Sequence, residues 1–150
     1  MKMYEDYRNE FRIRFKKYSD QEVIDAFNSQ VENHGSIGVK MAYLGVIKEN
    51  LIKRSIDFSA VGDEKVMSYA HCVILKERKM VRVIDLSIGE IELLFQKWVE
   101  TCRPGIAVDL PYVKGVYKET DKIHIASNII GYGIQMALSI KDVVLRELNY

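Results

Sequence analysis

The sequence predicts an α+β fold with helices at the N-terminus, two β-hairpins and a long C-terminal helix. Apolar residues recur every three or four positions in several segments and alternate with a period of two in others, which predicts helices and strands respectively. The chain has 150 residues, of which 48% are hydrophobic and 29% charged, as is typical of one globular core. We therefore predict a single domain, with a subdivision into 1–84 and 85–150 as the alternative.

Residues 3–18 carry two competing patterns. Five aromatic residues step by three or four positions, as on one face of a helix, whereas FRIRFK at 11–16 alternates apolar and basic residues as in a strand. We favour the helix because its pattern is longer, and the strand stays open as the alternative. The aromatic residues are Tyr4, Tyr7, Phe11, Phe15 and Tyr18.

Two more helices are predicted in the N-terminal half. Ser19 and Glu22 form a capping box, in which each side chain bonds the free backbone N–H of the other, and a helix over 20–33 follows. Ser36 is the predicted N-cap of a helix over 37–54. We expect this helix to bury one broad apolar face, made of Ile37, Met41, Leu44, Ile47, Leu51 and Ile52.

Two hairpins with a helix between them complete the middle of the chain, and the hairpins could join in one antiparallel sheet. The strands are bounded by charged or turn-forming residues, and the helix by a second capping box and a proline. The predicted elements are strands within 66–84 joined at the charged tetrad 76–79, a helix from Ser87 and Glu90 to Arg103-Pro104, and strands at 112–118 and 122–126.

Residues 123–140 (IHIASNIIGYGIQMALSI) contain no Asp, Glu, Lys or Arg. Polar residues within the stretch and the lack of basic clusters beside it argue against a membrane span. Gly131-x-Gly133 lacks the third glycine of a dinucleotide-binding loop. A narrow polar stripe from Ser127 onward instead predicts a mostly buried helix to the C-terminus. Each glycine costs about 1 kcal/mol in a helix interior, so the pair needs a reason: a kink near 131–133, a late start of the helix, or the close approach of another element, such as a partner.

Composition bounds the function. The net charge of +1 and pI of about 7.7 show no overall charge excess that would indicate nucleic acid or an acidic membrane as partner. Cys72 and Cys102 are far apart in sequence, and the charged first 15 residues do not resemble a signal peptide. We therefore expect a cytoplasmic protein with free thiols and no cofactor, with a disulfide between the two cysteines as the alternative.

Three groups of residues are weighed as chemical sites, and none supports a catalytic assignment. Asp63 with Glu77 and Lys79 matches the acidic pair and lysine of many metal-dependent nucleases, but the last two fall in a predicted turn. His71 and His124 lie in predicted strands without the close spacing of zinc ligands. The third group is the N-terminal basic segment, made of Arg8, Arg12, Arg14, Lys16 and Lys17 among aromatic residues.

Three short motifs lie between 20 and 84: Tyr43-Leu44, RSIDFS at 54–59 and SYAHCV at 68–73. In these motifs the stretch resembles small proteins encoded in bacterial and phage genomes. Cys72 stands where that group usually has a basic residue. The group has no assigned activity, so the resemblance implies a cytoplasmic accessory protein of a mobile element and no reaction.

We expect a non-enzymatic binding protein that acts through a protein partner or self-association. The alternatives are a metal-dependent phosphodiesterase or nuclease, and a nucleotide or nucleic-acid binder that uses the N-terminal basic segment. No membrane partner and no bound metal are expected. The predicted binding residues are Tyr43, Arg54, Asp57, Ser59, His71, Gly131 and Gly133.

Overall fold

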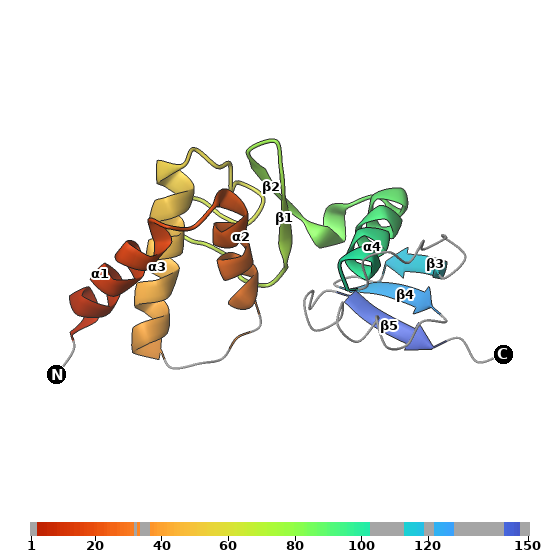
Figure 1. The fold of residues 1–150 in the computed structure, drawn as a ribbon, viewed down its shortest axis with the longest axis horizontal. Helices are drawn as coiled ribbons and strands as arrows, with labels where there is room; N and C mark the ends of the chain where they lie inside the picture. The colour runs from red at the N-terminus through yellow and green to blue at the C-terminus, as the bar shows by residue number, and fades with distance from the viewer. Residues whose placement is uncertain are drawn as a thin grey trace. The chain divides into compact units, whose positions relative to one another are not determined.

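The computed structural model describes residues 3–31, 33, 37–102, 113–118, 122–127 and 143–147. The chain divides into two compact units, Met1–Arg82 and Val83–Tyr150, each with its own sheet (Figure 1). The α+β class is confirmed, while the number of independently folding domains stays a prediction. Among the described residues, no helix is both long enough and apolar enough to cross a membrane.

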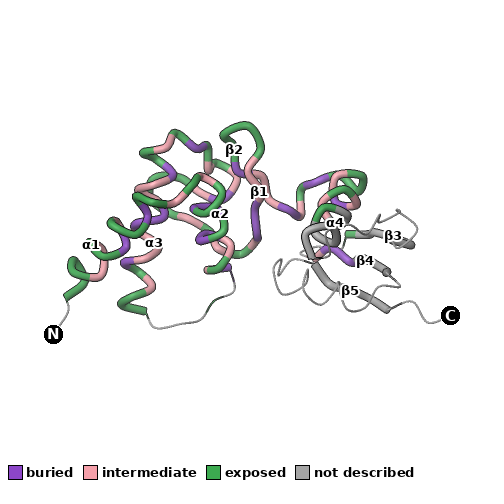
Figure 2. The backbone as a smooth tube through the Cα atoms, viewed as in Figure 1, coloured by how far each residue is buried: buried purple, intermediate pink, exposed green. Residues whose placement is uncertain are grey.

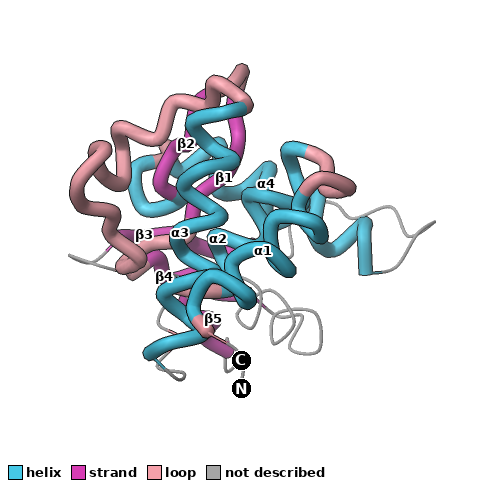
Figure 3. The backbone as a smooth tube through the Cα atoms, turned by 90° about the vertical axis from the view of Figure 1, so that its left-hand side faces the viewer, coloured by secondary structure: helices cyan, strands magenta, loops and turns pink. Residues whose placement is uncertain are grey.

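The first unit begins with three helices: α1 (Tyr4–Phe15), α2 (Asp20–Ser29) and α3 (Ile37–Lys53). The helical prediction for the N-terminal segment is thus confirmed over the range of α1. The first capping box is also confirmed, because the N–H of Glu22 donates to Ser19 Oγ and the N–H of Ser19 donates to Glu22 Oε1, both at 3.1 Å. Figures 1 and 3 show α1 lying across α3, against which it packs.

The buried face of α3 differs from the predicted one. Ile47 and Leu51 are buried as expected, but Ile37, Met41 and Ile52 are exposed. Apolar residues occupy more than one side of this helix, so periodicity did not define a single face, and contact with α1 and α2 covers only part of it. The residues of α3 that are buried are Ala42, Val46, Ile47 and Leu51.

A short hairpin of β1 (Val73–Lys76) and β2 (Lys79–Arg82) follows, in register from Val73 opposite Arg82 to Lys76 opposite Lys79. Its two turn residues, Glu77 and Arg78, have φ of 47° and 69°, as two-residue hairpin turns require. The predicted first strand was too long, because residues 68–72 are not strand. There the N–H of Ser68 donates to the carbonyl of Val61 and turns the chain away from the ladder.

The second unit contains a 3₁₀ turn (Val83–Asp85), α4 (Ile88–Cys102) and three strands, β3 (Val113–Lys118), β4 (Ile123–Ser127) and β5 (Val143–Glu147). The capping box at the start of α4 is confirmed by the bond from the N–H of Glu90 to Ser87 Oγ at 3.2 Å. β3 and β4 are antiparallel, and they belong to a different sheet from β1 and β2. The expectation that both hairpins form one sheet is therefore wrong for the described residues.

The prediction of a helix that continues to the C-terminus is wrong over the described residues 143–147. Residues Val143–Glu147 form β5, which pairs parallel to β4. Adjacent valines favour a strand, and β4 supplies the backbone partners that a strand needs. The glycine pair of the predicted helix, Gly131 and Gly133, lies outside the described residues.

The core of the first unit is aromatic and aliphatic. Phe27 is fully buried and stacks on Tyr69, with ring centroids 4.6 Å apart and planes inclined by 27°. Figure 2 marks the buried residues of α2 and β1 in purple and the exposed start of α3 in green. The largest buried side chains of this unit are Phe15, Phe27, Ile24, Ile47, Leu51 and Met80.

Candidate functional site

Arg54, predicted as a binding residue, is held at the C-terminal end of α3 by bonds to two other segments of the chain and to α3 itself. Its Nη1 donates to Asp20 Oδ1 at 2.9 Å, and its Nη2 donates to the carbonyl of Phe15 at 3.0 Å. Its Nε donates to Asn50 Oδ1 at 3.3 Å. The last carbonyls of a helix lack intrahelical donors. Arg54 therefore bonds the last residue of α1 and the first residue of α2 with a single side chain.

A second arginine completes this network. Arg78, in the turn of the β1–β2 hairpin, donates to Asp20 Oδ2 and to the carbonyl of Arg54. The hydrogen bond from Arg54 is the main reason that the pKa of Asp20 is lowered, and the bond from Arg78 adds to it. One carboxylate thus joins two guanidinium groups, which connects the helices to the hairpin.

Asp57 and Ser59 form a local turn beside this network. Asp57 Oδ1 accepts from the N–H of Ser59 at 2.9 Å, and bonds to the Ser59 side chain and backbone lower the pKa of Asp57. The backbone of Asp57 pairs with the hairpin: its N–H donates to the Arg78 carbonyl, and its carbonyl accepts from the N–H of Met80, both at 2.8 Å. The 54–59 loop therefore connects the hairpin to α3 through backbone hydrogen bonds. Its role in binding a ligand stays a prediction.

Tyr43 lies between α1 and α3 in an aromatic cluster. Its ring meets those of Phe11 and Phe15 edge to face, with centroids 5.0 Å and 5.4 Å apart. Burial is the main cause that raises the pKa of its hydroxyl, and a hydrogen bond with Ser29 partly opposes the rise. This geometry is that of a half-buried tyrosine whose ring packs in the cluster and whose hydroxyl is hydrogen-bonded.

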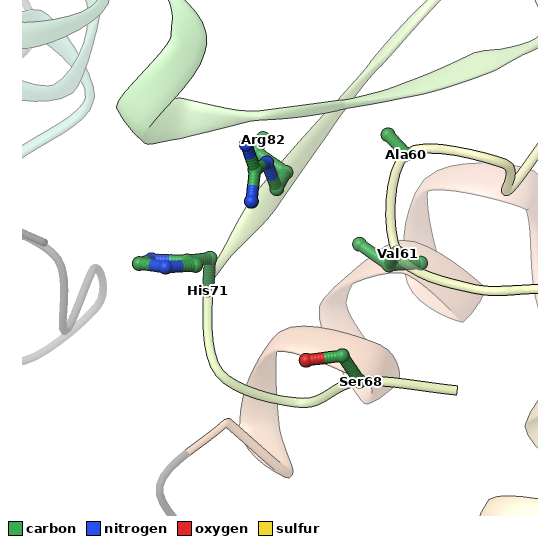
Figure 4. A pocket seen from close by; sticks show the side chains of 5 residues that line it. All are labelled: Ala60, Val61, Ser68, His71 and Arg82. Carbon is green, nitrogen blue, oxygen red and sulfur yellow. The ribbon is translucent and has the colours of Figure 1, made fainter. Parts of the chain in front are cut away.

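His71 lines a pocket of about 70 Å³ together with Ala60, Val61, Ser68 and Arg82. Figure 4 shows Arg82 above and to the right of His71, the two apolar side chains across the space, and Ser68 below them. Arg82 is the last residue of β2, opposite Val73. The pocket therefore lies at the open end of the hairpin, and we call it the hairpin pocket.

The residues weighed as a nuclease site lie in two separate turns. Asp63 Oδ1 accepts hydrogen bonds from the N–H groups of Lys65 and Val66, both at 2.8 Å. These bonds lower the pKa of Asp63, and the bond from Val66 has the larger effect. Glu77 lies in the hairpin turn, as predicted, and Lys79 starts β2. Within the described part of the chain, no three His, Cys, Asp or Glu residues gather closely enough to hold a metal ion.

The two histidines weighed as metal ligands belong to different units. His71 is in the first unit, and His124 is buried in β4 of the second, opposite Tyr117 of β3. Cys72 is buried, and the side chain of Cys102 lies outside the described ones, so their proximity stays a prediction.

The N-terminal basic segment is partly neutralised by the fold. Two of the nitrogens of Arg12 donate to Glu49 of α3 at 3.0 Å and 2.8 Å, and Arg8 donates to the same carboxylate. These contacts lower the pKa of Glu49 to about 2, and the hydrogen bond from Arg12 is the largest cause. Lys16, Lys17 and Arg14 are exposed, the last with its guanidinium 5.4 Å from the Phe11 ring centroid.

Two residues with a clear role in the structure were not predicted from the sequence. Asn28 of α2 acts as a strand partner, because its Nδ2 donates to the Val73 carbonyl at 2.9 Å and its Oδ1 accepts from the Val73 N–H at 2.8 Å. Its place next to buried Phe27 is the signal that would have revealed it, since a polar side chain near a core needs partners. Arg82 is the other residue, and it carries no such signal because it ends a four-residue strand, KMVR, that also begins with a charged residue.

Comparison with known proteins adds no identity, since no family model matches the chain and neither a curated protein nor a solved structure matches it.

Proposed function

We propose that the protein is a non-enzymatic binding protein that works by self-association through the first turn of α3. The observation that carries this proposal is the exposure of two large apolar side chains on one face of α3, four positions apart, 81% for Ile37 and 54% for Met41. We call them the α3 apolar surface. Binding is stabilised by about 25 cal/mol for each Å² of apolar surface that a partner removes from water.

A second copy is the partner that fits the charge of this surface. Lys40 is the one charged residue among 37–47, and its ammonium donates to the carbonyl of Asn33. In a two-fold dimer the same patch faces itself, so a patch with several like charges would repel its copy. The net charge of +1 also leaves little repulsion between whole molecules.

The use of charged side chains within the fold supports the same proposal. Arg54 and Asp57 were predicted to bind a ligand, and Asp63 was considered as part of a nuclease site. In the structure each of the three side chains hydrogen-bonds backbone groups of the chain itself. The resemblance of residues 20–84 to accessory proteins of mobile elements is in keeping with a binding role. The proposal places the protein in the cytoplasm, as the sequence predicts, and the nuclease and nucleic-acid alternatives stay predictions.

Sedimentation velocity over a concentration series tests self-association. We expect the wild-type chain to form dimers as its concentration rises, and the double variant Ile37→Ser/Met41→Ser to remain monomeric because two apolar contacts are lost. Ile13→Ser is the matched control, since Ile13 is 62% exposed on α1 and is not part of the α3 apolar surface. A wild-type chain that is monomeric at every concentration, or a double variant that dimerises as the wild type does, would contradict the proposal.

A further inference from the structure

The hairpin pocket gathers three kinds of hydrogen-bond donor against an apolar wall. Arg82 contributes a guanidinium, His71 an imidazole and Ser68 a hydroxyl, while Ala60 and Val61 form the opposite side (Figure 4). The lining of this described pocket contains no Asp or Glu. Arg82 brings a positive charge to this lining, and an anion is the ligand that such donors favour.

The backbone holds these donors in place. The N–H of Ser68 donates to the Val61 carbonyl at 2.7 Å, which ties one side of the pocket to the other. Ser68 Oγ accepts from the N–H of Ala70 at 3.3 Å, so its own O–H can be donated in another direction. Arg82 is held by the β1–β2 ladder at its pairing with Val73.

The volume restricts the size of the ligand. A pocket of about 70 Å³ is far smaller than the roughly 300–1,000 Å³ of sites for drug-sized ligands. It has room for one small group. Donors from three side chains suit a tetrahedral oxyanion with three or more oxygens better than a carboxylate with two, and the planar fork of a guanidinium matches two phosphate oxygens.

We propose that the hairpin pocket binds a phosphate group, with Arg82 as the main contact and Ser68 and His71 as further donors. The group is inorganic phosphate or the terminal phosphate of a small phosphomonoester, whose chemistry is the same at this site. His71 and Arg82 also interact with other groups of the protein. A guanidinium has five N–H donors, so Arg82 can keep such an interaction and still bind an oxyanion.

Isothermal titration calorimetry of the full chain with inorganic phosphate, against chloride at equal ionic strength, tests this site. We expect saturable binding of one phosphate per chain. Arg82→Gln should weaken it by about tenfold or more, which is the loss of one charge-assisted hydrogen bond, and Ser68→Ala should weaken it less. Arg14→Gln is the matched control, because it removes the same charge from an exposed position on α1 and should leave the affinity unchanged.

Circular dichroism of each variant shows whether it is folded. If Arg82→Gln does not fold, Arg82→Lys replaces it, since lysine keeps the charge and loses the fork. Titration with glycerol phosphate separates the sources: tighter binding than inorganic phosphate indicates a phosphomonoester, and weaker binding indicates the free anion. The proposal is overturned if phosphate gives no saturable binding, or if the Arg82 and Ser68 variants bind it as tightly as Arg14→Gln does.

Discussion

The two ends of α3 use their side chains in opposite ways. At the C-terminal end, Glu49 and Arg54 are bonded to residues of α1 and α2. At the N-terminal end, Ile37 and Met41 are apolar and exposed. The charged end, which looks like a binding motif in the sequence, has a structural role, because its side chains bond α3 to α1 and α2. The apolar end has no such explanation within the described residues, and it is there that we place the contact surface.

Position in the fold accounts for this difference. The C-terminal end of α3 lies where three other segments meet: the end of α1 at Phe15, the start of α2 at Asp20, and the hairpin turn at Arg78. Polar backbone groups and charges gather at such a junction and need partners. The first turn of α3 makes no comparable set of bonds among the described residues, so its side chains are available to a partner.

The largest effect is expected from Arg54→Ala. The substitution removes donors to Phe15 and Asp20 at once and leaves a carboxylate and a helix carbonyl with fewer partners, so we expect unfolding free energy to fall by about 2–3 kcal/mol. Urea denaturation measures it. Arg14→Ala, an exposed arginine of α1, should change stability by less than about 0.5 kcal/mol. Equal effects of the two variants would show that the charged end of α3 is not a structural junction.

Asn28→Ala extends the comparison to α2, where a polar side chain is again used inside the fold. Loss of the amide leaves the N–H and carbonyl of Val73 without their side-chain partner, and we expect a loss of about 1–2 kcal/mol in the same urea assay. Gln21→Ala is the control, because Gln21 is exposed on the same helix and its amide donates to the side chain of Asp25, one turn away. A loss no larger than that of the control would rule out this role for Asn28.

Glu49→Gln is expected to have a smaller and pH-dependent effect. The carboxylate is 36% exposed, so solvent screening limits its contribution to about 1 kcal/mol. The folded-state pKa of about 2 lies below the ordinary value of 4.5, so this contribution is full above the ordinary value and is lost as pH falls toward 2. Urea unfolding of both proteins across that range measures the difference, and a difference that stays constant would refute the ion pair.

Substitution at the exposed end should have the smallest effect on stability. Because Ile37 is 81% exposed, we expect Ile37→Ser to change the unfolding free energy by less than about 0.5 kcal/mol at concentrations where the chain is monomeric. Thermal and urea unfolding at low concentration measure this. A loss of more than about 1 kcal/mol would mean that the side chain is buried within the molecule, and the contrast between the two ends of α3 would then fail.

Much of the helical part could be predicted from the sequence because its signals are local. A capping box such as that of Ser19 and Glu22 satisfies its hydrogen bonds within one turn, so the residues that begin α2 are adjacent in the chain. The turn at Glu77 and Arg78 is equally local. The candidate site was predicted only in part, since His71 was named and Arg82 was not. Arg82 comes close to His71 because β2 pairs with β1, and the sequence pattern does not specify that pairing.

The sequence by itself determined the α+β class, the start of α2 and α4, the turn of the first hairpin and the strands of the second. Tertiary structure decided which side of α3 is buried, that Arg54 bonds Asp20, and that 143–147 is a strand beside β4. The physical reason is the range of the interactions. A helix bonds itself within four residues, whereas a strand, a buried face or an ion pair takes its partner from a distant segment, which no local pattern specifies.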